Sequence, residues 1–278
     1  MAQKDHPTNR VRPPLKWAGS KFQILEDIRK HLPSGNRLIE PFVGSGTVFI
    51  NTRYDHFLLN DVNHDLIDFY RRIQTEGEEF IAFARSFFQP KNNREAAYYR
   101  LRETFNTTPD MRLKAALFLF LNRFGYNGLC RYNSRGENNV PFGRYKQPYF
   151  PQRELELFME KSRHAEFTCE DFSTVMRQAR TGDVIYCDPP YVPLSTTANF
   201  TSYAARGFTE DEQIQLAELA AEISRQGITI LISNHDTPFT REIYQPARKY
   251  RIDVRRMISC NGNCRGMAKE VLAVYSGK

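Results

Sequence analysis

Apolar runs and amphipathic stretches alternate along the chain, a pattern typical of proteins in which strands and helices follow one another. Residues 37–42, 57–60 and 183–187 are short apolar runs of the kind that forms strands buried on both faces of a parallel sheet. Residues 154–163 and 210–226 have helical spacing instead. We therefore predict an α/β fold, with later strands at 228–233, 251–257 and 270–275.

The middle of the chain has a different pattern. From residue 66 to about 116 it is helical and polar, and residues 114–124 are apolar nearly all round, which predicts a buried helix that supports the loop after it. Large apolar residues in the first stretch have helical spacing, so we interpret them as core packing rather than as platforms for a ligand. They are Phe69, Tyr70, Ile73, Phe80, Phe83, Ala84 and Phe87.

A glycine-rich turn follows the first strand. Gly44 and Gly46 would let this loop turn tightly and let its backbone approach a ligand. Asp61 ends the second apolar run about 20 residues later, where an acidic residue can accept ribose hydroxyls. Phe49 stands where the dinucleotide fingerprint has its third glycine. The pattern therefore favours a nucleoside cofactor without a pyrophosphate, such as S-adenosylmethionine (AdoMet).

A possible catalytic loop follows the third apolar run, where Asp188, Pro189, Pro190 and Tyr191 come in succession. Ligands of open α/β sheets bind at the carboxyl ends of strands, and the two prolines restrict the backbone there. The Asp188 carboxylate and the Pro189 carbonyl can accept both hydrogens of an exocyclic amine while the Tyr191 ring stacks on a flat base. A strand-ending turn without function is the alternative that this stretch alone leaves open.

Together these motifs resemble those of one family, the Dam (DNA adenine methylase) branch of the N6-adenine DNA methyltransferases. The sequence LKWAGSK at 15–21 is similar to the family's N-terminal cofactor motif, EPFVGSG at 40–46 to its AdoMet loop and DPPY at 188–191 to its catalytic motif. The segments NRFGYNGLCRYN at 122–133 and NVPFGRY at 139–145 resemble its DNA-reading part. The order of the motifs is that of the alpha group of these enzymes.

The resemblance implies a Rossmann-like class I fold of AdoMet-dependent methyltransferases with an inserted helical target-recognition domain. Residues 1–14 would then be a disordered lead, 15–65 the AdoMet-binding half of the catalytic domain, 66–150 the helical DNA target-recognition domain and 151–278 the catalytic half. AdoMet is the implied cofactor and double-stranded DNA the implied substrate. GATC is the implied site, although relatives with a longer GAT-containing site have similar reading segments.

The resemblance also assigns roles to single residues. Residues implied to line the AdoMet site are Trp17, Lys21, Glu40, Phe42, Gly44, Gly46, Asp61 and Asp188. Implied DNA contacts are Lys16 and Arg131 to guanines, Leu129 and Pro141 to a thymine methyl, Tyr126 and Asn127 in the gap left by a flipped base, and Asn133 and Arg144 to phosphates. Without the resemblance, Trp17 could equally be core packing and Lys21 a solvated lysine.

The catalytic loop suits the chemistry of an adenine amine, whose lone pair is delocalised into the ring. Hydrogen bonds from both amine hydrogens to Asp188 and the Pro189 carbonyl favour a pyramidal nitrogen with its lone pair aimed at a methyl group. No separate strong base is needed, because the amine becomes acidic as it is methylated and can lose its proton to Asp188 or water. An adenine inside a duplex cannot reach the loop, so it must be flipped out and clamped by Tyr191.

Composition agrees with a nucleic-acid partner. The 278 residues carry a formal charge of +7 with a pI near 9.1, and arginines interleaved with tyrosines at 122–150 are typical of surfaces that hold phosphates and stack on bases. Five scattered cysteines imply no disulfide framework, and the pair Cys260 and Cys264 has no second ligand pair nearby, so we expect no metal. Without a secretory signal or a membrane-spanning run, the protein is expected to be cytoplasmic. We also expect a monomer in solution.

Three rival functions remain open. N4-cytosine, RNA and protein amide methyltransferases have related motifs that begin with Ser or Asn, against which Asp188 argues. Phe49 disfavours a nicotinamide oxidoreductase, and a DNA-binding module without activity would not explain cofactor and catalytic loops together. His235 ends a strand near the expected site, where it could touch the substrate or be satisfied by neighbouring backbone. The loop 261–267 has few basic residues for a phosphate contact.

Overall fold

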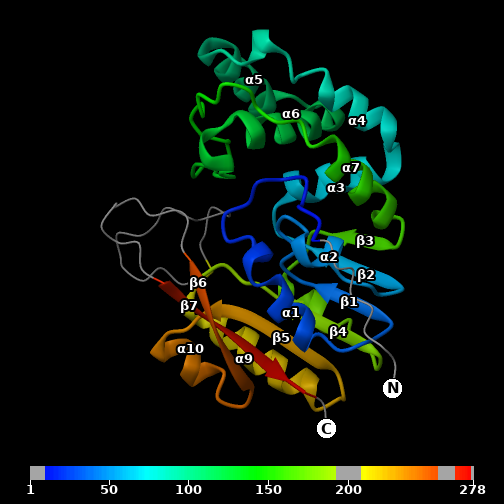
Figure 1. Ribbon diagram of the computed structural model, residues 1–278, viewed down its shortest axis with the longest axis vertical. Coiled ribbons are helices and arrows are strands. Elements are labelled where there is room, and N and C mark those ends of the chain that lie inside the picture. Colours follow the sequence, from blue (N-terminus) through cyan, green and yellow to red (C-terminus); the bar gives the residue numbers. More distant parts are fainter. Residues whose placement is uncertain (1–9, 192–207, 256–266, 277–278) are drawn as a thin grey trace.

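The computed structural model describes residues 10–191, 208–255 and 267–276. They form a seven-stranded sheet with the order β3-β2-β1-β4-β5-β7-β6, and helices lie against both of its faces (Figure 1). The predicted α/β methyltransferase architecture is confirmed. The strands are β1 (Arg37–Glu40), β2 (His56–Asn60), β3 (Ala165–Thr168), β4 (Asp183–Cys187), β5 (Thr229–His235), β6 (Arg248–Arg255) and β7 (Met267–Tyr275).

The topology determines where the functional loops meet. Strands β1 to β5 pair in parallel, whereas β7 runs antiparallel between β5 and β6. The chain first builds the sheet outwards from β1 through β2 to β3, and later places β4 on the other side of β1. Such a reversal opens a crevice at the carboxyl ends of the two central strands. Both motif-bearing loops begin there, one after Glu40 and one after Cys187.

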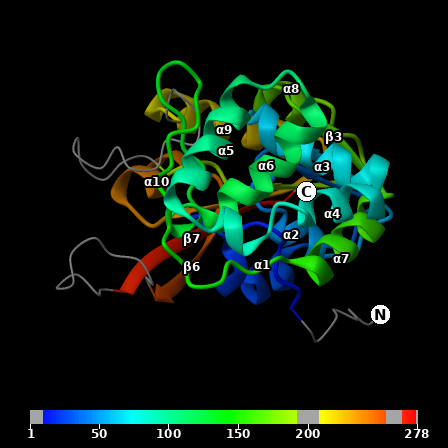
Figure 2. The ribbon, with the colours of Figure 1, turned by 90° about the horizontal axis from the view of Figure 1, so that it is seen from above.

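Helices cover both faces of the sheet. Successive strand residues point to opposite faces, so neighbours along one strand enter different cores. Leu38 and Tyr186 belong to the core under one layer, and their neighbours Ile39 and Ile185 belong to the core under the other. Seen from above, α8, α9 and α10 lie towards one side and α1, α2 and α7 towards the other (Figure 2). The helices are α1 (Leu25–His31), α2 (Thr47–Asn51), α3 (His64–Glu76), α4 (Glu78–Arg85), α5 (Glu95–Thr107), α6 (Met111–Phe124), α7 (Gln152–Ser162), α8 (Phe172–Met176), α9 (Glu210–Ser224) and α10 (Pro238–Ile243).

Helices α3 to α6 form the helical part of the chain beyond β3 in Figure 1. Helix α6 is buried over its last ten residues, as the apolar run at 114–124 predicts. The side chains expected to pack in the core do so: Phe69, Tyr70, Ile73, Phe80 and Ala84 are buried, with Phe83 and Phe87 packed against them. One core runs from these helices into the sheet. The division into an inserted domain at 66–150 therefore stays a prediction.

Several local features differ from the expectations. The end of the supposed disordered lead is packed, because the Val11 N–H donates to Asn51 Oδ1 at 2.8 Å and the Pro14 carbonyl accepts a hydrogen bond from Arg123. Residues 1–9 of that lead lie outside the described residues. Strand β3 and helices α8 and α10 were not predicted, since each is too short to show a clear period.

Candidate active site

The glycine loop and the DPPY loop begin side by side. Ile39 on β1 lies opposite Ile185 on β4 in the parallel register, so the loops that follow these strands leave the same edge of the sheet next to each other. Residues that were chosen from sequence motifs about 140 positions apart are thereby brought together. This edge is the candidate active site.

The glycine loop has a backbone that only glycine adopts readily. Gly44 and Gly46 have φ angles of +47° and +72°, in the left-handed region. A side chain at position 44 would meet the Trp17 Nε1 atom at 2.9 Å, so the indole lies directly against the loop. The Tyr70 hydroxyl donates to the Gly44 carbonyl at 2.6 Å, and the Gly44 N–H donates to Asp61 Oδ2 at 3.1 Å. The loop is therefore held in one shape.

Two acidic residues of the predicted cofactor site differ in their surroundings. Asp61 holds the Gly44 N–H with Oδ2 and the Asn63 N–H with Oδ1, and burial raises its pKa to about 6. Glu40 is 2% exposed, and its Oε1 has no hydrogen-bond partner among the described residues. Burial raises the pKa of Glu40 well above its usual range, against the opposing charge of Lys161 and a hydrogen bond from the Phe49 backbone. Asp61 thus holds the loop directly, whereas Glu40 is buried beside the Phe49 backbone and the charge of Lys161.

Lys21 and Phe42 complete the predicted cofactor residues. Lys21 begins the 3-10 turn Lys21–Gln23 and is 4% exposed. Phe42 follows β1 and stacks on Phe172 with ring centroids 5.5 Å apart and an interplanar angle of 28°. Phe208 contacts the edge of Phe42, also at 5.5 Å. Phe42 is therefore anchored in the aromatic packing of the α8 layer.

The side chain of Lys21 reaches into the DPPY loop. Its Nζ lies 2.9 Å from Asp188 Oδ1 and 4.0 Å from Glu270 Oε2, and it donates to the Tyr191 hydroxyl. Burial by itself lowers the pKa of Lys21, but the charges of Asp188 and Glu270 and the contact with the Tyr191 hydroxyl outweigh it and raise the pKa above its ordinary value. Lys21 is therefore a buried cation compensated by two carboxylates, and the alternative of a solvated helix lysine is wrong.

Asp188 is held on one side only. Its Oδ1 accepts from Lys21 and from the Ser233 hydroxyl, the latter at 3.3 Å. Burial raises the pKa of Asp188, and the charge and hydrogen bond of Lys21 limit that rise. Ser233 also lies 2.8 Å from the hydroxyl of the buried Tyr186. Both contacts that the described residues make with the carboxylate fall on Oδ1, so Oδ2 is the oxygen available to a ligand.

The Tyr191 ring packs against His235, the last residue of β5. Their ring centroids are 3.7 Å apart with an interplanar angle of 23°. The Tyr191 hydroxyl donates to Glu270 Oε1 at 3.1 Å. His235 thus contacts the catalytic motif through its ring, an arrangement that goes beyond a histidine satisfied by backbone. Pro190 takes part through its carbonyl, which accepts from Gln213 Nε2 at 2.8 Å and fixes the loop to α9.

The predicted reading segment leaves α6 and joins the N-terminal motif. Asn122 accepts the Lys16 N–H at 2.9 Å and donates to the carbonyls of Lys16 at 2.7 Å and Gly128 at 3.2 Å. The Lys16 ammonium lies 4.2 Å above the Tyr145 ring. Burial and the charge of Arg123 lower the pKa of Lys16. Lys16 and the reading segment are therefore one local unit, although 106 residues separate Lys16 from Asn122.

The residues predicted to enter the DNA lie at a strained turn. Tyr126 is 51% exposed, and Asn127 has a φ of +53°, which is uncommon for a residue other than glycine. The Asn127 N–H donates to the Tyr145 hydroxyl at 2.9 Å, which holds the turn. Leu129 is partly exposed and Pro141 is exposed. A hydrogen bond from the Tyr126 N–H to the Pro141 carbonyl brings the two halves of the segment together.

Three polar residues of the reading segment have partners within the protein. Arg131 donates from Nε to Asn139 Oδ1 at 2.7 Å and from Nη2 to the Asn139 carbonyl at 3.0 Å. Asn133 accepts two backbone N–H groups in the turn before Glu137 and donates to that carboxylate at 2.7 Å. Arg144 is exposed and pairs with Glu95 at 3.0 Å. DNA contacts by Asn133 and Arg144 would replace these carboxylate partners with phosphates.

Arg123 differs from the other basic residues of this stretch. It is 7% exposed and donates to the Pro14 carbonyl, with its guanidinium 5.6 Å from the Tyr149 ring. Burial lowers its pKa to about 10. Counting Arg123 as part of a phosphate-binding surface is therefore wrong, because its side chain ties the N-terminal segment to α6. The sequence pattern could not distinguish a buried arginine from an exposed one.

Glu270 and Ser233 were missed by sequence reasoning. Both lie on inner strands, where Glu270 lies opposite His235 in the pairing of β5 with β7. Glu270 could have been found from the sequence, because it stands at the start of the apolar run 270–275, where an unpaired charge would be costly to bury. Ser233 gave no comparable signal, since a serine in a strand is common.

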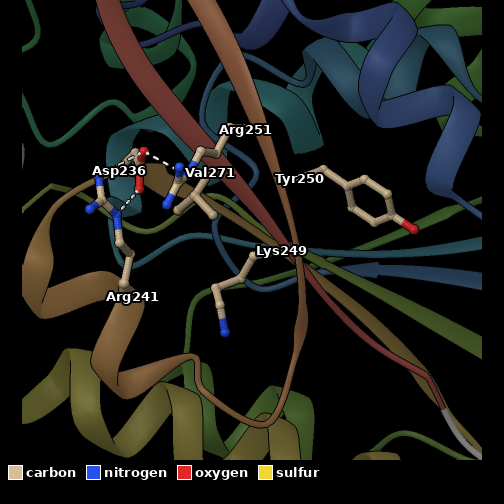
Figure 3. A pocket seen from close by; sticks show the side chains of 6 residues that line it. All are labelled: Asp236, Arg241, Lys249, Tyr250, Arg251 and Val271. Carbon is tan, nitrogen blue, oxygen red and sulfur yellow. Dashed lines mark hydrogen bonds and ion pairs between the residues drawn. The ribbon is translucent and has the colours of Figure 1, made fainter.

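One pocket of about 580 Å³ lies elsewhere, between α10 and the strands β5 to β7 (Figure 3). Arg241 and Arg251 converge on the buried carboxylate of Asp236, at 2.6 Å and 3.3 Å. Lys249 points away from them and donates to three backbone carbonyls after α10. These pairings account for the charges of the pocket, and none of the predicted site residues lines it.

Metal ligands and membrane segments were also sought in the described ranges. Within them no three His, Cys, Asp or Glu side chains are grouped so as to hold a metal ion. No helix there is long and apolar enough to cross a membrane. Cys130, Cys169 and Cys187 are free. Cys260, Cys264 and most of the loop 261–267 lie outside the described residues.

Known proteins resemble this chain over nearly its full length. Residues 17–258 match the model of a family described as D12 class N6 adenine-specific DNA methyltransferase. The DNA adenine methylases of Salmonella typhi and Escherichia coli strain K12 are each 52% identical over 261 residues, covering 94% of this chain and of each relative. That of Vibrio cholerae serotype O1, strain N16961, is 50% identical over 263 residues, covering 94% and 95%.

The fold and the site define an α/β methyltransferase. The chain belongs to the D12 class N6 adenine-specific DNA methyltransferase family. It is accordingly an enzyme that methylates adenine in DNA, as the motif resemblance implied, and the rival functions without this activity are wrong.

Proposed function

We propose that the protein transfers the methyl group of AdoMet to the N6 amine of an adenine flipped out of duplex DNA, within the sequence GATC. The observation that carries the proposal is the position of the DPPY loop beside the glycine loop. One oxygen of Asp188 is held there by Lys21 and Ser233, and the other is available to an amine.

The residues at the glycine loop fit AdoMet. The absence of a side chain at Gly44 leaves the loop backbone and the Trp17 indole in contact, a surface on which a purine nucleoside can lie. Each Asp61 oxygen holds one backbone N–H and keeps lone-pair capacity for a ribose hydroxyl. When bound, AdoMet supplies an electrophilic methyl group on a sulfonium. The residues that would hold it are Trp17, Lys21, Phe42, Gly44, Gly46, Asp61 and Asp188, with Glu40 buried beside the Phe49 backbone.

The protein's contribution to methyl transfer is mainly to position the amine. Oδ2 of Asp188 and the Pro189 carbonyl accept its two hydrogens, which turns the nitrogen lone pair out of the ring plane. Lys21 favours the ionised form of Asp188, because its charge opposes the rise in the pKa of that carboxyl that burial causes. Tyr191 offers one ring face to the base while His235 covers the other. The proton leaves the amine to Asp188 or water as the new bond forms.

The reading segment supports recognition of a short duplex site. Two hydrogen bonds to Asn139 fix the orientation of the Arg131 guanidinium, which prepares it for bidentate pairing with guanine O6 and N7. Lys16 would contact the other guanine, Leu129 and Pro141 a thymine methyl, and Tyr126 and Asn127 the space left by the flipped adenine. We further propose that the enzyme works as a monomer and where bacterial DNA lies, in the cytoplasm.

Long-read modification sequencing of DNA from cells that express the protein tests the site directly. N6-methyladenine is expected in GATC and not in other sequence contexts. Asp188→Ala should abolish methyl transfer, because it removes an acceptor needed in the transition state.

Single-turnover assays on a GATC duplex, with calorimetry on AdoMet, measure this effect. A variant rate within about tenfold of the parent, equivalent to about 1.4 kcal/mol of barrier, would contradict the proposed role of Asp188. Methylation in a longer GAT-containing sequence would correct the site without changing the chemistry.

A further inference from the structure

Strand β7 brings a second carboxylate to the DPPY loop. Glu270 is 8% exposed and contacts two members of the site at once. Its Oε1 accepts from the Tyr191 hydroxyl at 3.1 Å, and its Oε2 lies 4.0 Å from Lys21 Nζ. Both partners also face Asp188, since Lys21 pairs with that carboxylate and Tyr191 belongs to the same loop.

We propose that Glu270 is a positioning residue for methyl transfer. Through Lys21 it sets the charge and orientation of Asp188, and through the Tyr191 hydroxyl it sets the aromatic ring that faces the base. The proposal rests on the role of Asp188 as amine acceptor given above.

Lys21 is one buried cation between two carboxylates, Asp188 and Glu270. With Asp188 as its sole partner, the ammonium would form a neutral pair in a poorly solvated site, and Asp188 would be a weaker acceptor for the amine. Glu270 attracts the ammonium from a second direction. Because Lys21 is shared between the two carboxylates, it offsets only part of the negative charge of Asp188. Asp188 then remains a strong hydrogen-bond acceptor for the amine.

The Tyr191 ring is held at two places. His235 packs against one face of this ring, and the hydroxyl at the far end is held by Glu270 and Lys21. A ring fixed at a face and at its hydroxyl has one orientation, which leaves the other face for a base. Supporting contacts of this kind hold a functional group within the narrow range that its chemistry requires.

Glu270→Gln tests the proposal, since glutamine keeps the size of the side chain and can still accept from Tyr191 but no longer attracts Lys21. With AdoMet and a GATC duplex at saturation, the single-turnover rate should fall about 10- to 100-fold, the range for losing one interaction with a charged group. The dissociation constants for AdoMet and DNA should stay within about twofold of the parent values. Glu270→Asp should recover part of the rate.

Glu76→Gln is a matched control. Glu76 is also a carboxylate shared by two cations, Arg72 and Arg112, but it lies on α3 away from the DPPY loop. Its substitution should leave the single-turnover rate unchanged. A Glu270→Gln enzyme with the parent rate would overturn the proposal.

A double-mutant cycle with Lys21→Met identifies the route. If Glu270 acts through Lys21, then Glu270→Gln should change the rate less than about twofold in the Lys21→Met background. Two independent reductions that multiply would contradict that route. Should Glu270→Gln fail to fold, Tyr191→Phe removes the hydroxyl bond and keeps the ring; its rate should fall, and a parent-like rate would overturn the proposal.

The outcome for Asp188→Ala separates this inference from the proposed function. If Asp188→Ala stays active, the proposed function fails and the role of Glu270 fails with it. If Asp188→Ala is inactive while Glu270→Gln has the parent rate, the function stands and the positioning role of Glu270 is wrong.

Discussion

Burial raises the pKa of each of three carboxylates around the site, Glu40, Asp61 and Asp188. Their partners differ, however. Glu40 accepts a hydrogen bond from the Phe49 backbone, Asp61 accepts two backbone N–H groups and Asp188 is paired with Lys21. The surroundings of a buried carboxylate therefore differ at each position, and with them the contacts that the carboxylate can still make.

Asp61 should give the protein a measurable pH dependence of stability. Its pKa rises from 3.8 to about 6 in the folded state. The folded state therefore holds the proton more tightly, and this stabilisation is present below the unfolded pKa and is lost as the pH rises through about 6. Asp61→Asn cannot ionise. The free energy of unfolding of the variant, relative to the parent, should rise by about 2 kcal/mol between pH 4 and pH 6.

Urea denaturation of Asp61→Asn and the parent, both without cofactor, measures this difference at each pH. Comparing the two proteins removes the contribution of the other carboxyl groups. A difference that stays constant from pH 4 to pH 7 would show that Asp61 titrates normally. The variant should also bind AdoMet more weakly, which calorimetry can follow independently.

Arg131 should act on one base of the site. Arg131→Ala is expected to relax the requirement for the guanine it contacts by about 1 to 3 kcal/mol of discrimination, with the other positions still enforced. Asn139→Ala should give a smaller relaxation at the same base, because it removes the Nε bond to Oδ1 but keeps the guanidinium and its bond to the backbone carbonyl of residue 139. Methylation rates on duplexes altered at each position decide this. Equal loss of selectivity at all four bases would refute the assignment.

At the scale of elements, helix α6 links the core to the reading segment. Its last ten residues are buried, and its end is connected to two distant pieces of chain. Asn122 on α6 bonds the backbone of Lys16 and Gly128, and Arg123 bonds that of Pro14. Helix α6 therefore supports the reading loop, as its apolar sequence predicts. It also holds the backbone of the N-terminal motif in place.

Asn122→Ala should affect both stability and base selection. It leaves buried backbone groups of Lys16 and Gly128 without partners, at a cost of about 1 to 3 kcal/mol in the free energy of unfolding. Selectivity for the guanine assigned to Lys16 should fall as well. Asn106→Ala is the control, because Asn106 makes two similar bonds to the backbone of Asn138. It should lower stability alone; an equal change in selectivity would argue against a specific role for Asn122.

At the scale of the whole molecule, a formal charge of +7 favours a polyanionic partner. The structure qualifies this inference, because several cations already have partners. Arg241 and Arg251 share Asp236, Lys21 is buried, and Arg144 pairs with Glu95. Affinity for DNA should depend on which pairs are exposed enough to exchange a carboxylate for a phosphate at little cost.

Arg144 is the clearest exposed case. Arg144→Ala should weaken binding to GATC and altered duplexes almost equally and reduce the slope of log affinity against log salt by about one unit. Glu95→Gln removes the competing carboxylate and should strengthen binding at low salt. Fluorescence anisotropy at several salt concentrations measures both. If Arg144→Ala instead relaxed a single base position, Arg144 would belong among the base-reading residues.

Much of the fold could be predicted from sequence because its signals are local. The apolar run of β4 coincides with its residues 183–187, and the glycine turn after β1 has the backbone that Gly44 and Gly46 permit. The DPPY motif lies at the carboxyl end of its strand, as expected. Each of these depends on residues within a few positions of one another, where periodicity and backbone preference act directly.

The sequence by itself thus determined most of the strands, the turn of the glycine loop and the class of chemistry. Only the tertiary structure decided which side chains meet. It brings Lys21 and Glu270, 249 positions apart in the chain, together at the same loop, and it buries Arg123 while leaving Arg144 exposed. The reason is physical: burial and pairing of a charge depend on which strands become neighbours, and no local pattern carries that information.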